Sequence, residues 1–120
     1  MDLGNLKYWE EEELAKDSST SVDVLRGLAK GGNVIVRNHV AENPSAPVDA
    51  LRELAKDGNY EVRYYVTDNP KVSSKILVML FEYEKSLRQP DFRVIRALYT
   101  HTNLPAFVKR VIETLFGDIL

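Results

Sequence analysis

The chain has 120 residues, of which 44% are hydrophobic and 28% are charged, and it contains two histidines and no cysteine. This length predicts one domain, and the lack of cysteine excludes disulfides, thiolate zinc sites and cysteine-ligated iron–sulfur clusters. The net charge of −2 is uneven, because residues 1–24 carry −5 (seven acidic and two basic side chains) and the rest carries +3. This asymmetry is too small to indicate a nucleic-acid-binding protein.

No stretch approaches the roughly 18 apolar residues of a membrane span, and the first residues lack the basic and apolar regions of a secretory signal. We therefore expect a cytoplasmic location without membrane association. Two histidines leave little for an imidazole metal site. We expect no metal and no cofactor.

A period of 26 residues organises the chain, because residues 22–47 and 48–73 are identical at fourteen of twenty-six aligned positions. Such a fixed period is typical of solenoid proteins, in which neighbouring repeats stack. The alignment extends to an N-terminal half repeat at 1–21 and, more weakly, to a third repeat at 74–105. About seven extra residues, around 84–90, interrupt this third repeat, and residues 106–120 supply a C-terminal capping helix.

Each repeat is predicted to form a pair of helices. In the second copy, Pro47 begins a helix whose apolar positions, such as Leu51 and Leu54, have helical spacing, and Gly58-Asn59 ends it. The next helix turns Val62 inward and stops at Asn69-Pro70, since a residue before proline leaves α geometry. Neither helix buries its apolar stripe alone, so successive pairs must stack.

The ends of the stack need residues that cover the outermost repeats. At the N-terminal end, the residues expected to cover the first repeat are Tyr8, Trp9 and Leu14. The segment 76–87 predicts a first helix longer than its counterparts. A last helix, 106–116, is expected to cover the final repeat with Phe107, Val111, Ile112 and Leu115. The apolar residues at 116–120 either dock on this cap or support self-association.

The segments Val36-Arg37-Asn38-His39-Val40-Ala41-Glu42-Asn43-Pro44 and Val62-Arg63-Tyr64-Tyr65-Val66-Thr67-Asp68-Asn69-Pro70 resemble the VRxxVAxNP signature of leucine-rich-repeat-variant proteins. The resemblance covers residues 15–73 well and 74–116 loosely. It implies an all-α fold, a short right-handed α-solenoid of HEAT-like helix pairs. The iron–sulfur cluster described for that family needs cysteine ligands, which this chain lacks. The resemblance therefore implies an architecture and almost no function.

Three arginines, Arg37, Arg63 and Arg96, recur at one position of successive second helices. If these arginines form an exposed stripe, their guanidinium groups would bind carboxylates or phosphates of a partner. The favoured alternative is an internal ladder of ion pairs, as in HEAT repeats, with Asp57, Glu61 or Glu42 as the acidic partners.

The two positions after each arginine differ between copies, and variable positions are where repeat proteins place specificity. We therefore expect Asn38, His39, Tyr64 and Tyr65 to form a contact surface, since tyrosine is a common interface anchor. The alternative is that one residue of each pair packs between helices. No serine, cysteine or carboxylate beside His39 forms a known catalytic motif.

A second set of basic residues recurs on the first helices: Arg26, Lys30, Arg52, Lys56 and Lys75. Such a stripe can follow a phosphate backbone, but nearby carboxylates favour a solvated, salt-bridged face. The sequence thus indicates a non-enzymatic adaptor that binds an unidentified protein or peptide. The alternatives are a small nucleic-acid-binding regulator, which is disfavoured, or a self-assembling structural protein. We expect a monomer, or a weak homo-oligomer that forms through the apolar C-terminal end.

Overall fold

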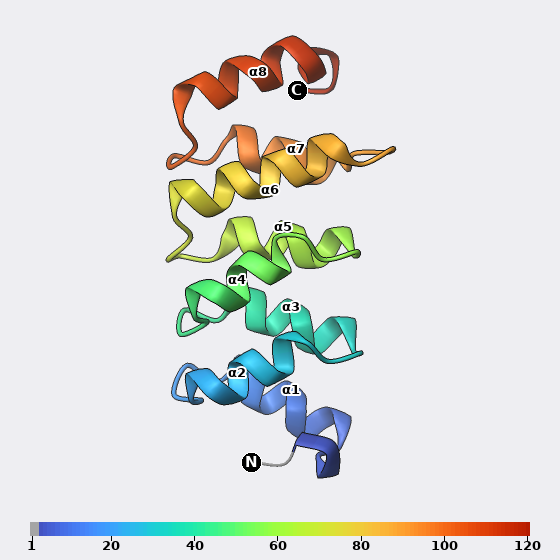
Figure 1. Ribbon diagram of the computed structural model, residues 1–120, viewed down its shortest axis with the longest axis vertical. Coiled ribbons are helices and arrows are strands. Elements are labelled where there is room, and N and C mark those ends of the chain that lie inside the picture. Colours follow the sequence, from blue (N-terminus) through green and yellow to red (C-terminus); the bar gives the residue numbers. More distant parts are fainter. Residues whose placement is uncertain (1–2) are drawn as a thin grey trace.

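The computed structural model describes residues 3–120, and within them the chain is all-helical, with eight α-helices and no strand (Figure 1). No helix in this range is long and apolar enough to cross a membrane. Two short 3-10 helices, η1 and η2, lie near the two ends. The elements are η1 (Leu3–Asn5), α1 (Tyr8–Lys16), α2 (Val22–Ala29), α3 (Val34–Glu42), α4 (Val48–Leu54), α5 (Tyr60–Asp68), α6 (Ser74–Ser86), α7 (Phe92–Tyr99), α8 (Ala106–Phe116) and η2 (Gly117–Ile119).

The helices form two layers along the long axis of the molecule. Helices α1, α3, α5 and α7 contact one another in succession and make up the odd layer, while α2, α4 and α6 do the same in the even layer. Helix α8 packs against α7 at one end, and the two termini lie at opposite ends of the stack (Figure 1). The molecule is elongated, with extents of 48 × 25 × 17 Å.

Polar side chains fix the first residues of the odd-layer helices. Asn33, Asn59 and Asp91 precede α3, α5 and α7, and each side chain accepts a hydrogen bond from the amide two residues later at 2.8, 2.8 and 2.9 Å. These bonds satisfy amides that have no partner inside the helix. The expectation that Gly58-Asn59 ends the preceding helix is therefore wrong: α4 ends at Leu54, and Asn59 caps α5.

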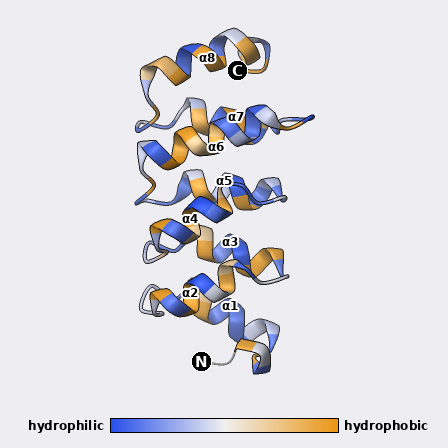
Figure 2. Cartoon of the chain, in the orientation of Figure 1, coloured by the Kyte–Doolittle hydropathy of each residue, from blue (hydrophilic) through white to orange (hydrophobic). Residues whose placement is uncertain are grey.

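One apolar core runs between the two layers. The predicted inward positions Leu51, Leu54 and Val62 are at most 1% exposed. Figure 2 shows apolar residues recurring along both layers of the stack. The helices between the two ends of the stack thus bury apolar residues against their neighbours, as the sequence periodicity predicts.

The ends of the stack differ from the prediction. Leu14 packs against the core and Ile112 is fully buried. The prediction is wrong for the remaining residues, which are exposed: Tyr8, Trp9, Phe107, Val111 and Leu115. In α8, Val108 and Ile112 already fill the inner face, and residues one turn apart share a face, so Phe107, Val111 and Leu115 point outward. Phe116 at the end of α8 and Ile119 in η2 pack against the core.

A buried asparagine is the C-cap residue of each of α3 and α5. The Nδ2 atom of Asn69 donates to the carbonyl oxygens of Ala41 at 2.8 Å and Asn43 at 2.9 Å, both at the end of α3. Asn43 in turn donates to the carbonyls of Ala15 at 2.8 Å and Asp17 at 3.0 Å, at the end of α1. The Asn-Pro motif therefore ties successive odd-layer helices together through carbonyls that a helix end leaves unpaired.

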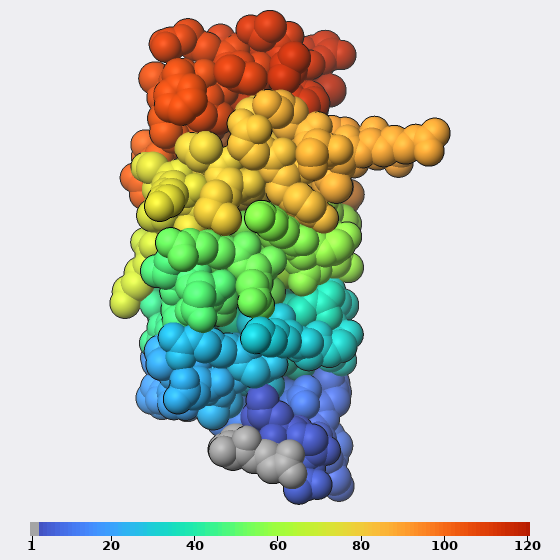
Figure 3. Space-filling model, viewed as in Figure 1, coloured from blue at the N-terminus to red at the C-terminus, as the bar shows by residue number. Residues whose placement is uncertain are grey.

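Helix α6 is longer than its even-layer counterparts, with 13 residues against 8 in α2 and 7 in α4, as predicted from residues 76–87. The extra length includes Glu84, which is fully buried. After α6, the connection to α7 projects from the side of the stack (Figure 3). The insertion around residues 84–90 thus lengthens α6 and forms this projection.

We predict that Asn69→Ala destabilises the fold, because it leaves two carbonyl groups at the end of α3 without their partner. With about 1–3 kcal/mol for a buried polar group left unsatisfied, the free energy of unfolding should fall by roughly 2–4 kcal/mol in urea titrations. Asn103→Ala is the matched control, since the Asn103 amide makes a single 3.4 Å contact with the Val72 carbonyl and the residue is exposed. Equal losses in the two variants would contradict this role of Asn69.

Candidate functional site

Arg37 makes an internal ion pair. Its Nε atom donates to Asp57 Oδ2 at 2.8 Å, and its Nη1 atom donates to the Gly31 carbonyl at 2.8 Å. Asp57 follows α4, so the pair links α3 to the next helix pair along the chain. This is the ladder contact that the sequence left open as the alternative to a partner-binding stripe.

Arg63 makes the equivalent contact in a buried setting, where Arg63 is 4% and Glu84 0% exposed. The Arg63 Nε and Nη2 atoms donate to Glu84 Oε1 at 3.3 and 3.2 Å, and Nη1 donates to the Asp57 carbonyl at 2.8 Å. Burial raises the pKa of Glu84, and the adjacent guanidinium charge opposes that shift. Because Arg63 is inaccessible to a partner, the prediction that it belongs to a binding stripe is wrong. Its carboxylate partner, Glu84, was not among the acidic residues predicted for the ladder of ion pairs.

Arg96, the third arginine of the row, is exposed on α7. Its Nε atom donates to the carbonyl oxygen of Ile119 at 2.7 Å, and its guanidinium lies 5.1 Å from the centroid of the Phe92 ring. Arg96 thereby helps to hold the C-terminal segment against the stack. Its guanidinium still lies at the surface, unlike that of Arg63.

The first variable pair, Asn38 and His39, is largely enclosed. Asn38 is 5% exposed and donates to Glu61 Oε2 at 3.3 Å. The His39 Nε2 atom lies 3.3 Å from Glu12 Oε1, and Nδ1 lies 4.0 Å from Glu42 Oε1. Within residues 3–120 no group of histidine and carboxylate side chains is arranged to hold a metal ion. The burial of Asn38 agrees with the alternative prediction, in which one residue of each variable pair packs between helices and does not belong to a contact surface.

The second variable pair, Tyr64 and Tyr65, lies at the surface of α5. Tyr64 is 38% exposed and Tyr65 is half-buried. Their ring centroids are 5.7 Å apart with an interplanar angle of 79°, an edge-to-face arrangement. Two roughly perpendicular aromatic walls thus form where the sequence predicts a contact surface.

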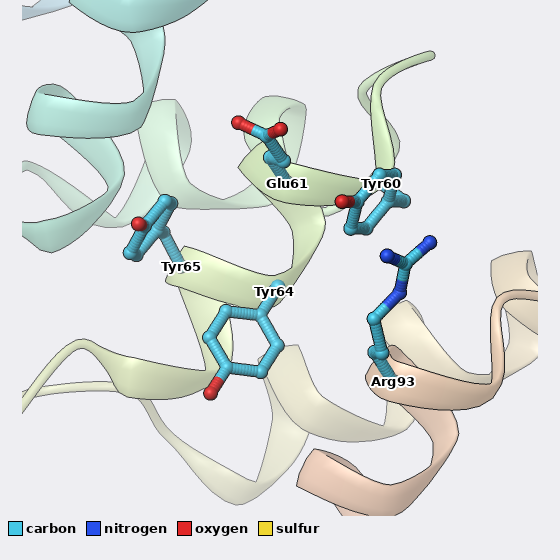
Figure 4. A pocket seen from close by; sticks show the side chains of 5 residues that line it. All are labelled: Tyr60, Glu61, Tyr64, Tyr65 and Arg93. Atoms are coloured by element: carbon cyan, nitrogen blue, oxygen red, sulfur yellow. The ribbon is translucent and has the colours of Figure 1, made fainter.

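These rings belong to a hollow that we call the tyrosine pocket, with a volume of about 410 Å³ (Figure 4). It is lined by Tyr60, Glu61, Tyr64, Tyr65 and Arg93. The Arg93 guanidinium stacks 3.8 Å from the centroid of the Tyr60 ring. A neighbouring hollow shares Tyr64 and Arg93 and continues along α7. The volume lies within the range of roughly 300–1,000 Å³ that is typical of ligand sites.

Three residues of the tyrosine pocket, Tyr60, Glu61 and Arg93, were not among the predicted site residues. Tyr60 and Glu61 align with Val34 and Ile35 in the first copy of the repeat. They vary between copies, so the criterion that selected Tyr64 and Tyr65 would have found them as well. Arg93 lies in the weakly matching third repeat, where the alignment gives no signal.

The basic residues of the even layer form a mixed surface. Arg26 lies 2.7 Å from Asp23 and 2.8 Å from Asp49 in ion pairs. The other members are exposed: Lys30, Arg52, Lys56 and Lys75. The pairing of Arg26 agrees with the interpretation of a solvated, salt-bridged face.

We predict that the Arg63–Glu84 pair behaves as a unit. Glu84→Leu leaves a buried guanidinium without its partner and should lower the free energy of unfolding by about 3–5 kcal/mol. Arg63→Met/Glu84→Leu removes both charges and should restore most of that loss, because apolar pairs often replace buried ion pairs at little cost. Denaturant titration of the two variants checks this, and a double variant less stable than Glu84→Leu would refute the coupling.

In comparisons with known proteins, no family model, no curated protein and no solved structure matches this chain. The resemblance to leucine-rich-repeat-variant proteins therefore stands on its two sequence motifs.

Proposed function

We propose that this chain is a short α-solenoid of HEAT-like repeats that acts as a non-enzymatic protein-binding module. The binding surface in this proposal is the α5/α7 face, which consists of Tyr60, Tyr64, Tyr65, Phe92, Arg93 and Arg96. The observation that carries the proposal is the tyrosine pocket, a hollow of about 410 Å³ that is lined by three tyrosine rings. Variable residues on a stacked scaffold are the usual binding elements of repeat proteins.

The composition of the α5/α7 face supports a protein partner. Tyrosine and arginine are enriched among the residues that dominate binding energy, because they offer a large contact area or several hydrogen-bond donors. Phe92 adds a ring that is 47% exposed beside Arg93 and Arg96. Large exposed aromatic side chains grouped in this way are typical of interaction surfaces.

The repeat architecture is supported by two agreeing observations. The sequence period of 26 residues matches the succession of contacts along the odd layer, from α1 through α3 and α5 to α7. The ends of α1, α3 and α5 are joined by equivalent asparagine contacts. An extended stack of this kind offers a long surface relative to its size, which suits recognition of a peptide or a partner surface.

We predict that Tyr64→Ala/Phe92→Ala abolishes most peptide binding without unfolding the protein. Peptides selected from a random display library against the immobilised wild-type chain should bind the double variant at least about tenfold more weakly, since each lost anchor costs more than about 1 kcal/mol. Calorimetric titration of the selected peptides measures the change in affinity. Circular dichroism verifies that the variant is folded.

The matched control is Val48→Ala on α4, because Val48 is exposed but lies in the even layer. This variant should bind the selected peptides with unchanged affinity. An equal loss in both variants would place the binding surface elsewhere. Displacement of the peptides by duplex DNA at low salt would favour the nucleic-acid-binding alternative.

Self-association is a second candidate function, favoured by the outer face of α8. Phe107, Val111 and Leu115 occur at intervals of four residues and form an exposed apolar stripe beside a hollow of about 320 Å³. Phe107 is 59% exposed, which is unusual for a phenylalanine without a partner. An apolar stripe on the last helix of a stack is suited to pairing with a second copy.

Sedimentation at several protein concentrations tests this candidate. If α8 mediates self-association, the weight-average mass of the wild-type chain should rise with concentration, and Phe107→Ser/Leu115→Ser should remain monomeric because the stripe becomes polar. A wild-type chain that stays monomeric throughout would exclude self-association at those concentrations.

A further inference from the structure

The tyrosine pocket presents aromatic faces on several sides of one space. In Figure 4, Tyr65 and Tyr60 lie on opposite sides, with Glu61 and Tyr64 at the remaining edges. The perpendicular rings of Tyr64 and Tyr65 form one corner. Aromatic rings carry partial negative charge on their faces, so several rings around one space attract a cation.

A cation already stacks on one of these rings. The guanidinium carbon of Arg93 lies 3.8 Å from the centroid of Tyr60, well within the roughly 6 Å of a cation–π contact. This intramolecular contact demonstrates the kind of group that the pocket rings accept. Tyr65 lies on the other side of the same space, and Tyr64 lies at its edge (Figure 4).

The surroundings of Tyr65 are negatively charged. Burial raises the pKa of the Tyr65 hydroxyl, and the carboxylates Glu42, Glu61 and Asp68 raise it further. Glu61 is held in place by the buried amide of Asn38, which donates to its Oε2 atom at 3.3 Å. A fixed carboxylate beside aromatic faces adds to their attraction for a cation.

The positive charge of Arg93 is largely balanced within the chain. Its Nε and Nη2 atoms donate to the two Asp91 carboxylate oxygens at 3.1 and 2.8 Å. The next arginine on α7, Arg96, uses its Nε atom for the Ile119 carbonyl. An acidic ligand would compete with these contacts, whereas a cationic ligand meets Glu61 and the rings of Tyr64 and Tyr65.

We propose that the tyrosine pocket binds a cationic side chain, arginine or lysine, of a partner polypeptide. The charged end of the side chain packs on the rings of Tyr64 and Tyr65, and its charge is paired with Glu61. This inference deepens the proposed protein-binding function and rests on it for the identity of the ligand as part of a polypeptide. The pocket itself can be tested without any partner.

The probes are single amino acids blocked at both ends: N-acetyl-arginine amide, N-acetyl-lysine amide, N-acetyl-citrulline amide and N-acetyl-glutamate amide. Citrulline has nearly the shape of arginine without its charge. Titration into the ¹⁵N-labelled full chain should shift the backbone amide signals of residues 60–65 saturably with the arginine or lysine probe. The citrulline probe should bind roughly tenfold more weakly, as expected when a desolvated cation–π contact is lost.

Glu61→Gln is the decisive variant, because glutamine retains an oxygen that accepts from Asn38 while the negative charge is lost. It should weaken binding of the better cationic probe about fivefold, as expected for one partly screened charge pair. Glu53→Gln is the matched control, since Glu53 is an exposed carboxylate on α4, and it should leave the affinity unchanged. Circular dichroism verifies that both variants are folded.

Equal binding of the arginine and citrulline probes, stronger binding of the glutamate probe, or no saturable shift with any probe would overturn the cationic site. If that happens while display-selected peptides still depend on Tyr64 and Phe92, the protein-binding function stands and only the charge preference is wrong. Cationic probes that bind as expected, without any selected peptide depending on Tyr64 and Phe92, support the pocket but contradict the protein-binding function.

Discussion

A buried asparagine at the end of an odd-layer helix is the contact on which this stack depends. The side-chain amide of Asn69 donates to two carbonyl groups at the end of α3, and Asn43 does the same for α1. Seven of the eight described α-helices have 7–11 residues, a length at which isolated helices are marginal in water. Each helix therefore needs its neighbours, and the asparagines set the position of one helix end relative to the next.

The arginine ladder adds a second set of links, and its chemistry changes along the chain. Arg37 pairs with Asp57 in the connection after α4, while Arg63 pairs with Glu84 inside the lengthened α6. The insertion thus moves the acidic partner from a loop into a helix and buries it completely. Both arginines also donate to a backbone carbonyl six residues earlier in the chain. This hydrogen bond helps to fix the orientation of the guanidinium group.

Residues that make these links, such as Arg37 and Arg63, are identical in the two copies of the repeat, whereas positions that differ between the copies supply most of the pocket. Tyr60, Glu61, Tyr64 and Tyr65 occupy positions where the first copy carries Val34, Ile35, Asn38 and His39. All four side chains lie on α5, so this part of the pocket is formed by a helix and not by a loop. Arg93 comes from the neighbouring helix α7 and completes the pocket from the other side.

Apolar spacing and the Asn-Pro motifs at helix ends are local signals, so the helical class, the helix pairs and the period of 26 residues can be predicted from the sequence. It also placed Tyr64 and Tyr65 at a surface. The burial of Arg63 against Glu84 and the outward position of Phe107 follow from how the helices pack. The same packing brings Arg93 onto the ring of Tyr60. Periodicity reports which face of a helix is apolar, whereas contacts between residues 21 or 33 positions apart depend on how neighbouring helices pack.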